Sequence, residues 1–205
     1  MRVPNFPQLL RKETSSGAVL PLVVPDFERA RILNVGSARY AWENAINIDI
    51  RPGQDAQVRA DAHVLPFADA SFDVLVCTGT LQYLQRPRQA LAEFRRVLRP
   101  GGTVYVDVPF MQPYCRGTPD LWRFSVDGLR QLFRGWDVLE VGTSIAAGPA
   151  LADYAQQVCR GLPLHRVPKY AITWATSLLV WPLTLLRTHA PDVAGAFYLV
   201  ARREP

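Results

Sequence analysis

Two aspartates stand where their carboxylates could bind a nucleoside. Asp49 ends one short apolar run of the sequence, and Asp61 follows a weaker one. A carboxylate at the end of a strand can accept hydrogen bonds from both hydroxyls of a ribose. A second carboxylate can accept from an exocyclic amine such as N6 of adenine. Gly36, directly after the apolar run 31–35, predicts a tight turn at which the backbone can approach a ligand closely.

The elements that must position these residues alternate between strands and helices. Apolar and β-branched runs predict strands, and the apolar spacing of 87–98 predicts a helix that Pro100-Gly-Gly102 ends. Ser125 is a good N-cap for a second helix that runs through Phe133. The predicted strands are 31–35, 45–49, 55–59, 72–77, 103–108, 136–141 and 196–201.

This alternation predicts an α/β fold with a parallel sheet that is doubly wound, so that helices cover both faces. In such sheets ligands bind beyond the carboxyl ends of the strands. Gly36, Asp49, Asp61 and residues 77–79 all follow predicted strands. We therefore expect them to lie along one edge of the sheet.

The composition excludes several classes of protein. The chain has 205 residues, of which 49% are hydrophobic and 20% charged, which is typical of one globular domain. Cys77, Cys115 and Cys159 are scattered and form no C-x-x-C pair, so we expect reduced thiols and no metal site. The net charge of +5 is spread along the chain, which argues against a nucleic-acid partner.

Two longer blocks are more specific. They read Asp61-Ala-His-Val-Leu-Pro-Phe-Ala-Asp-Ala-Ser-Phe-Asp73 and Arg96-Val-Leu-Arg-Pro-Gly-Gly102. With Gly36 and Asp49, they resemble the class I S-adenosylmethionine-dependent methyltransferases of the type 11 group. A third block, Pro119-Asp-Leu-Trp-Arg-Phe-Ser125, resembles the Asp-Tyr-Trp-Arg-Phe-Thr signature of a subgroup often found beside polysaccharide and natural-product biosynthesis.

The resemblance implies a Rossmann-like, doubly wound sheet of seven strands, mostly parallel with an antiparallel last strand, and S-adenosylmethionine as cofactor. The loop at Gly36 would lie against the methionine part, Asp49 would hold the ribose and Asp61 would meet adenine N6. Thr78 would face the sulfonium. The implied cofactor-binding residues are Asn34, Val35, Gly36, Ser37, Asp49, Ile50, Asp61, Ala62 and Thr78.

The first loop departs from the pattern of this group. Asn34 replaces the usual acid, which weakens a contact to the ammonium group of the cofactor. Ser37 and Ala38 replace the second and third glycines, and the short link from Gly36 to Asp49 leaves little room for the usual first helix. Both an active and a degenerate site are compatible with these changes.

Methyl transfer from a sulfonium is an in-line displacement, so the protein mainly positions two substrates and supplies a base where the acceptor must lose a proton. His63 and Asp107 are weaker candidates, since His63 could equally be a surface residue and Asp107 lies within a strand. Asp120 and Arg123 could instead form an internal ion pair, and Trp122 with Phe124 an aromatic plug on the sheet. The candidate catalytic residues are Tyr83, Tyr114, Asp120 and Arg123, the last three in the loop where an acceptor would enter.

The function expected from the resemblance is methyl transfer to an oxygen or nitrogen of a small-molecule or glycan/lipid-linked acceptor. The alternative is a non-catalytic cofactor-binding or scaffolding protein of a biosynthetic cluster. A nicotinamide-binding domain is disfavoured, because the sequence lacks the Gly-x-Gly-x-x-Gly motif.

The apolar stretch 170–186 carries no charge, and Lys169 and Arg187 flank it. It is shorter than the roughly 20 residues of a spanning helix, and Pro182 interrupts it. A crossing would also separate the predicted last strand from its sheet. We expect a helical insertion that packs in the core or forms a substrate lid. The alternative is peripheral membrane contact through 170–187, and a membrane-spanning segment is the least favoured.

One domain is expected over 1–205. Residues 1–30 form a lead-in, 31–145 the cofactor-binding core, 146–194 the insertion or lid and 195–202 the last strand. The first ten residues lack the apolar region of a signal peptide, so we expect a cytoplasmic protein that is membrane-associated if the insertion meets a bilayer. The sequence does not give the oligomeric state.

Overall fold

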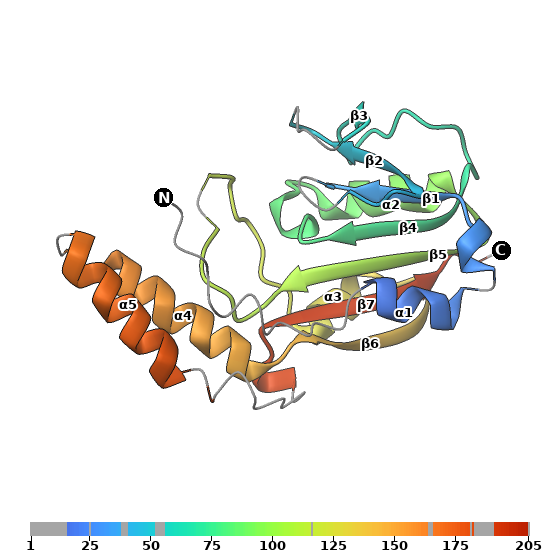
Figure 1. Ribbon diagram of the computed structural model, residues 1–205. Coiled ribbons are helices and arrows are strands. Elements are labelled where there is room, and N and C mark those ends of the chain that lie inside the picture. Colours follow the sequence, from blue (N-terminus) through green and yellow to red (C-terminus); the bar gives the residue numbers. More distant parts are fainter. Residues whose placement is uncertain are drawn as a thin grey trace.

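A single mixed sheet organises the described part of the chain (Figure 1). The computed structural model describes residues 16–24, 26–37, 41–51, 56–115, 117–163, 166–180, 182 and 191–204. Within them, seven strands lie in the order β3-β2-β1-β4-β5-β7-β6. The strands are β1 (Ile32–Val35), β2 (Ala45–Asp49), β3 (Val58–Arg59), β4 (Phe72–Thr78), β5 (Leu98–Pro109), β6 (Asp137–Ile145) and β7 (Ala196–Arg202).

The direction of the strands confirms the predicted fold class. β1 pairs in parallel with β2 and β4, and the parallel pairing continues outward to β3 and β5. β7 is antiparallel to both of its neighbours, β5 and β6. The carboxyl ends of the five parallel strands therefore meet at one edge of the sheet, where ligands bind in this class of fold.

Helices cover both faces of the sheet. In Figure 1, α2 and α3 lie behind it and α1 lies in front. The described residues between β1 and β2 contain no helix, in line with the short link expected there. Among the described residues, the helices are α1 (Ser16–Val23), α2 (Pro87–Val97), α3 (Val126–Leu132), α4 (Ala147–Gly161) and α5 (Arg166–Val180). The 3-10 turns there include η2 (Phe27–Arg29), η3 (Leu81–Tyr83) and η5 (Pro191–Val193).

The larger core lies between the sheet and the pair α2 and α3. Strand residues such as Leu33, Leu75 and Val106 alternate toward this face because successive side chains of a strand point to opposite sides. Phe94 of α2 and Phe133, which follows α3, are fully buried against them. Burying one such side chain stabilises the fold by about 1.5–3 kcal/mol.

The opposite face is covered by α1. Leu20 of this helix packs with Val74, Val76 and Tyr105, and the ring of Tyr105 stacks on that of Tyr198 at 5.8 Å. The lead-in expected at 1–30 therefore contains a helix that closes the sheet. Sequence periodicity did not predict it because Pro21 lies inside the helix, where it removes a backbone donor.

The predicted element boundaries agree best where a local signal is strong. Val97 ends α2 just before Pro100-Gly-Gly102, and the Ser125 hydroxyl accepts from Gly128 N at 3.1 Å, as expected of an N-cap. Four strands are longer than predicted, β4 and β7 by one residue and β5 and β6 by several. β5 begins at Leu98 because its first residues continue beside Phe72 after a register shift, and β6 extends to Ile145 beside β7.

Arg96 fastens the segment 65–69 onto α2. Its guanidinium donates to both carboxylate oxygens of Glu93, to Asp69, and to the carbonyls of Leu65 and Phe67, at 2.7–2.9 Å. The Arg96 hydrogen bonds lower the pKa of Glu93, whose carboxylate also accepts from Leu65 N at 2.8 Å. The Arg96 block of the sequence thus fixes the chain that follows Asp61.

We predict that Arg96→Met lowers the free energy of unfolding by about 2 kcal/mol, because hydrogen bonds to charged groups contribute about 1.5–3 kcal/mol and two carbonyls lose their donor. Urea unfolding followed by circular dichroism measures the loss. Arg99→Met is the matched control, because Arg99 is more exposed and pairs with Asp73 only at the surface. We expect it to change stability by less than about 1 kcal/mol. Equal losses in the two variants would contradict the role given to Arg96.

Candidate active site

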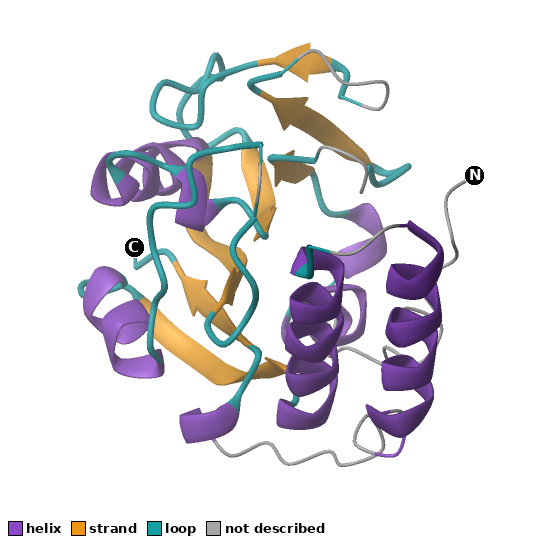
Figure 2. Ribbon diagram, turned by 90° about the vertical axis from the view of Figure 1, so that its left-hand side faces the viewer, coloured by secondary structure: helices purple, strands orange, loops and turns teal. Residues whose placement is uncertain are grey.

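The loops after β1, β2 and β4 meet at the carboxyl edge of the sheet, which Figure 2 views end-on. Gly36 N and Ser37 N both donate to Ile48 O, at 2.8 and 3.0 Å. Thr80 Oγ1 donates to Gly36 O at 3.3 Å. The three loops therefore hold one another in place, as the strand order requires.

Gly36 allows the closest of these approaches. Its φ of +73° favours glycine, and a Cβ at this position would lie 2.0 Å from Thr80 Oγ1. We expected the lack of a side chain at Gly36 to make room for a ligand. The Thr80 side chain fills the space that a Cβ of residue 36 would occupy. Sequence reasoning did not single out Thr80, because a threonine after a strand carries no signal of its own.

Asn34 is buried and has a structural partner. Its Nδ2 donates to Asn47 Oδ1 at 2.8 Å, and Asn47 lies directly beside it on β2. Asn47 in turn bonds Trp42 N and Trp42 O at 2.9 Å, which holds the link between β1 and β2. An ionised aspartate at position 34 could not donate this bond. Val35 is buried in the core, so only its backbone can face a ligand, and Ala38 lies outside the described residues.

Asp49 is buried at the end of β2. Its Oδ1 accepts from Arg51 N at 2.9 Å, and Arg51 Nε lies 3.9 Å from the same oxygen. Ile50 beside it is exposed and can cover an aromatic ring. The pair thus has the chemistry that a ribose and its base require.

Asp61 is held by the histidine two residues later. Its Oδ1 accepts from His63 N at 2.9 Å and lies 2.6 Å from His63 Nδ1, while Arg86 N donates to His63 Nε2 at 3.3 Å. Burial by itself raises the pKa of Asp61, but the His63 hydrogen bonds and the nearby Arg86 charge outweigh it and lower the pKa. Within the described part of the chain these bonds use only Oδ1, so Oδ2 can accept from a ligand. Ala62 is buried beside it, and the surface position considered for His63 is wrong.

Two buried polar atoms at this edge have no hydrogen-bond partner among the described residues. They are the hydroxyl of Ser37, after β1, and Oε1 of Gln82, in the turn η3 after β4. The other amide atom of Gln82, Nε2, donates to Gly79 O at 2.8 Å. Because buried polar atoms are almost always paired, both indicate a place for a polar ligand. Thr78, at the end of β4, is exposed at the same edge.

The loop 110–124, which follows β5, is fastened to η3. Leu121 N and Trp122 N both donate to Gln82 O, and Trp122 Nε1 donates to Leu84 O at 2.8 Å. Trp122 stacks on Phe124 but is half-exposed, so it does not close the sheet as an aromatic plug would. Its hydrogen bond to Leu84 instead holds this loop in place. Phe124 does pack against the core.

Asp120 and Arg123 form the internal ion pair that the sequence left open. Arg123 donates to both carboxylate oxygens of Asp120, and Cys115 N donates to Asp120 Oδ2 at 2.9 Å. The Arg123 bonds lower the pKa of Asp120, whose side chain is 1% exposed. Asp120 is therefore a weak base, and both of its carboxylate oxygens already accept hydrogen bonds from Arg123.

Tyr83 lies near this pair, whereas Tyr114 is 62% exposed. Burial and a hydrogen bond with Cys115 raise the pKa of Tyr83 to about 12. Its phenol therefore keeps its proton at neutral pH and can donate a hydrogen bond. Of the four candidate catalytic residues, the structure brings Tyr83, Asp120 and Arg123 together and leaves Tyr114 at the surface.

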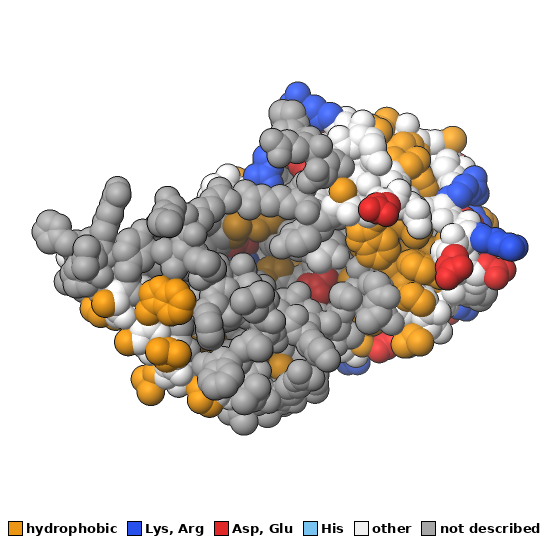
Figure 3. Space-filling model, viewed as in Figure 1, with side chains coloured by type: hydrophobic (Ala, Val, Ile, Leu, Met, Phe, Trp, Pro, Cys, Tyr) orange, Lys and Arg blue, Asp and Glu red, His pale blue; other side chains and the backbone are white. Residues whose placement is uncertain are grey.

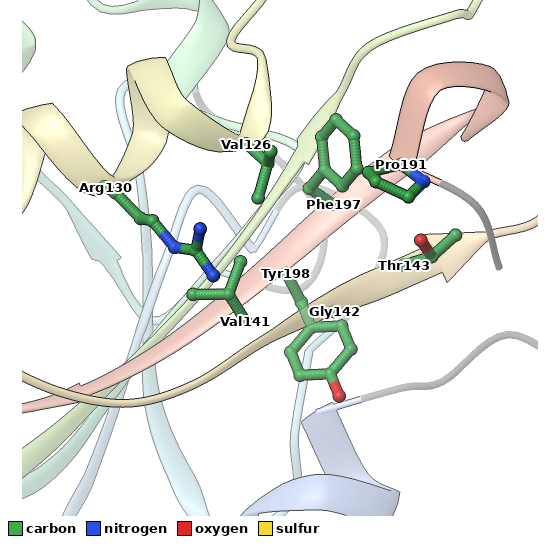
Figure 4. Close-up of a pocket in the computed structure, with 8 residues that line it drawn as sticks. All are labelled: Val126, Arg130, Val141, Gly142, Thr143, Pro191, Phe197 and Tyr198. Carbon is green, nitrogen blue, oxygen red and sulfur yellow. The ribbon is translucent and has the colours of Figure 1, made fainter.

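A hollow of about 400 Å³ lies elsewhere, between α3, β6 and β7 (Figure 4). Arg130, Val141 and Phe197 line it. None of the site residues expected from the sequence does so. The space where α3 covers β6 and β7 is thus separate from the candidate site.

Residues 31–106 match the family model described as a methyltransferase domain. The match spans β1 to β5 and includes Gly36, Asp49, Asp61 and Thr78. Over this region the chain is similar to class I S-adenosylmethionine-dependent methyltransferase domains. The cofactor of that class is the one the sequence blocks implied.

Curated relatives match over part of their length. A ubiquinone/menaquinone biosynthesis C-methyltransferase of Desulfotalea psychrophila is 34% identical over 131 residues, which cover 58% of this chain and 53% of the relative. The human thiol S-methyltransferase TMT1B is 42% identical over 91 residues, which cover 44% and 33%. The chain thus spans about half or less of the length of these relatives.

Solved structures share the fold of the domain. An S-adenosylmethionine-dependent methyltransferase from Thermotoga maritima superimposes with a TM-score of 0.60 at 15% identity, covering 90% of this chain and 86% of that one. The cyclase SpnF gives 0.55 at 19% identity, covering 97% and 80%. Since a cyclase has the same architecture, the reaction must be argued from the site residues.

We predict that the ion pair of Asp120 and Arg123 stabilises this loop in a pH-dependent way. Because the pKa of Asp120 is lowered on folding, its contribution is present above the usual value near 3.8 and is lost as the pH falls through the lowered pKa. Urea unfolding of the wild type and Asp120→Asn should show a constant difference at neutral pH that shrinks in acid.

The control for this series is Asp127→Asn, because Asp127 is 88% exposed and lies 3.8 Å from Arg130. We expect it to follow the wild type across the pH range. A difference between wild type and Asp120→Asn that does not change with pH would exclude the ion pair as its source.

Proposed function

We propose that this protein transfers a methyl group from S-adenosylmethionine to an oxygen, nitrogen or sulfur of a small-molecule or glycan/lipid-linked acceptor. The observation that carries the proposal is the buried Asp49 carboxylate at the sheet edge, where Ser37 Oγ and Gln82 Oε1 lie in adjoining loops without partners among the described residues. Burying such atoms unpaired is unfavourable, so they support a bound polar ligand at this edge.

The residues at this edge fit the adenine and ribose of the cofactor. Asp49 would accept from the ribose hydroxyls and Ile50 would cover the adenine. Oδ2 of Asp61 would accept from N6, and the backbone of Ala62 would contact the ring. These assignments follow the family pattern and match the burial and bonding of each side chain.

The two unpartnered atoms fit the amino-acid end of the cofactor. The Ser37 hydroxyl can donate to its carboxylate, and Gln82 Oε1 can accept from its ammonium group. Gln82 would in this way replace the acid that is absent at position 34, since the Asn34 amide is bonded to Asn47. The changes in the first loop are then compatible with binding.

The chain contributes mainly positioning to the reaction. When bound, the cofactor supplies a methyl group on a positively charged sulfur. The loop 110–124, pinned to η3, would hold the acceptor in line with that group and exclude water. Tyr83 would donate a hydrogen bond to the acceptor, and Arg123 would keep Asp120 in place.

The site has few groups that could act as a base, and this restricts the kind of nucleophile that the acceptor can carry. Asp120 is engaged by Arg123, and Tyr83 holds its proton at neutral pH. We therefore favour acceptors whose nucleophile is an amine or ionises readily, such as a thiol or an acidic phenol. The named activity of one relative, a thiol S-methyltransferase, supports including thiols in a screen.

Three further assignments belong to the same proposal. We place the block Pro119-Asp-Leu-Trp-Arg-Phe-Ser125 in the biosynthetic subgroup, because its residues fasten the acceptor loop. We keep 31–145 as the cofactor-binding core and 146–194 as the insertion. We place the reaction in the cytoplasm, with peripheral membrane contact through the insertion.

We predict that Asp49→Asn weakens binding of S-adenosylhomocysteine at least about tenfold, because a buried unpaired donor costs about 1–3 kcal/mol. Calorimetric titration of the purified protein measures this, with NAD as the negative ligand. Asp127→Asn is the control and should bind like the wild type. Unchanged binding by Asp49→Asn would refute the cofactor assignment.

We predict that Tyr83→Phe leaves binding of S-adenosylhomocysteine unchanged but slows methyl transfer about tenfold or more, because it removes a positioned hydrogen-bond donor. Formation of S-adenosylhomocysteine in single turnovers with a thiol, a quinol and an aminosugar measures the rate. Cofactor binding without turnover on any of these acceptors would favour the scaffolding alternative.

A further inference from the structure

Helix α5 presents its apolar side chains outward. Leu178 and Leu179 are 60% and 80% exposed, and Ile172 and Trp174 are exposed as well. The side chains that are less exposed include the polar Thr173 and Thr176. A helix on the surface of a water-soluble protein has the opposite arrangement. Burial of 170–186 in the core, as the sequence suggested, is therefore wrong for the described side chains of α5, and residues 183–186 lie outside the described part.

Helix α4 packs beside α5, and it too has exposed apolar side chains and buried polar ones. Leu151, Tyr154 and Val158 are exposed and lie on one helix face, because they are spaced by three and four residues. The buried side chains include Gln156 and Cys159, and Cys159 Sγ lies 3.2 Å from Thr176 Oγ1. A polar contact thus joins the two helices, while Leu151 and Val158 face outward. In Figure 3, apolar side chains gather on this part of the surface at the lower left.

The charge of this segment favours one kind of partner. Between Tyr154 and Pro191 the sequence has no aspartate or glutamate, but it has Arg160, Arg166, Lys169 and Arg187. Arg160 belongs to the last turn of α4 and Arg166 to the first turn of α5, so basic residues occur where the two helices are joined. The exposed apolar side chains of α4 and α5 and the basic sequence of this segment together complement an anionic bilayer.

The helices are suited to lie on a bilayer and not to cross it. α5 has 15 residues, which gives a length of about 22 Å against a hydrocarbon core of about 30 Å. No helix in the described ranges is long and apolar enough to span a membrane. Trp174, on the exposed face, is a residue type that gathers at the interface between lipid and water.

We propose that the hairpin of α4 and α5 (residues 147–180) docks on an anionic lipid surface and inserts its exposed apolar side chains into the interface. The hairpin extends from the sheet on the side of the carboxyl ends of the parallel strands (Figures 1 and 2). Tyr154 OH donates to Gln112 O at 3.0 Å, which joins α4 to the acceptor loop 110–124. Docking would bring that loop to the bilayer. Resting on the proposed methyl transfer, we infer an amphiphilic acceptor that is dissolved in or linked to lipid.

Sedimentation with vesicles tests the docking. We expect the full chain to pellet with vesicles of phosphatidylcholine and phosphatidylglycerol, to pellet less with phosphatidylcholine alone, and to be released by salt. The double variant Leu178→Glu/Leu179→Glu should bind at least about tenfold more weakly. The matched control is Leu22→Glu/Ile46→Glu, two exposed apolar residues outside the hairpin, which should bind as the wild type does.

Titration with S-adenosylhomocysteine without vesicles separates this proposal from the proposed function. Both double variants should bind the ligand like the wild type, which also shows that they fold. Vesicle binding without ligand binding would refute the function and leave the docking intact. Equal pelleting of both double variants, or no pelleting with anionic vesicles, would overturn the docking. A further result would also overturn the docking: the wild type forms a dimer on gel filtration and binds no vesicles, and Leu178→Glu/Leu179→Glu dissociates the dimer. The apolar face would then be a protein interface.

Discussion

The close approach of Gly36 and Thr80 is the contact on which the candidate site depends. It joins the loop after β1 to the loop after β4, and the strand order places these loops side by side. Because no side chain at position 36 separates them, Ser37 and η3 lie at the same edge, and η3 in turn carries the acceptor loop through Gln82 O. Backbone conformation at one glycine therefore influences how the loop after β1 lies relative to η3 and the loop 110–124.

The described residues between β1 and β2 contain no helix, and other contacts hold this part of the sheet. Where the family usually has a helix after the first strand, this chain has a short link, and the buried amide pair of Asn34 and Asn47 holds it. Each such hydrogen bond contributes about 1 kcal/mol, but leaving either amide unpaired would be more unfavourable. The sheet face is covered instead by α1, which comes from before the first strand. Asn34 is thus better explained by this packing than by loss of function.

Much of the fold could be predicted from the sequence, because its strongest signals are local. Apolar runs located β1, β2 and β4, and Ser125 and Pro100-Gly-Gly102 marked helix ends. The remaining features depend on tertiary contacts. Thr80 matters only because Gly36 faces it, and the pairing of Asp120 with Arg123 depends on how the loop closes. The apolar run in α5 could not show which side faces the protein, since a helix that is apolar over most of its surface has no clear inner face.

The engagement of Asp120 by Arg123 has a consequence for kinetics. Neither Asp120 nor Tyr83 changes its protonation state near neutrality, so neither adds an ionisation there to the dependence of turnover on pH. Asp120 is charged well below neutrality and Tyr83 titrates near 12. A plot of rate against pH would then follow the ionisation of the acceptor, so that its midpoint would identify the chemical group that receives the methyl.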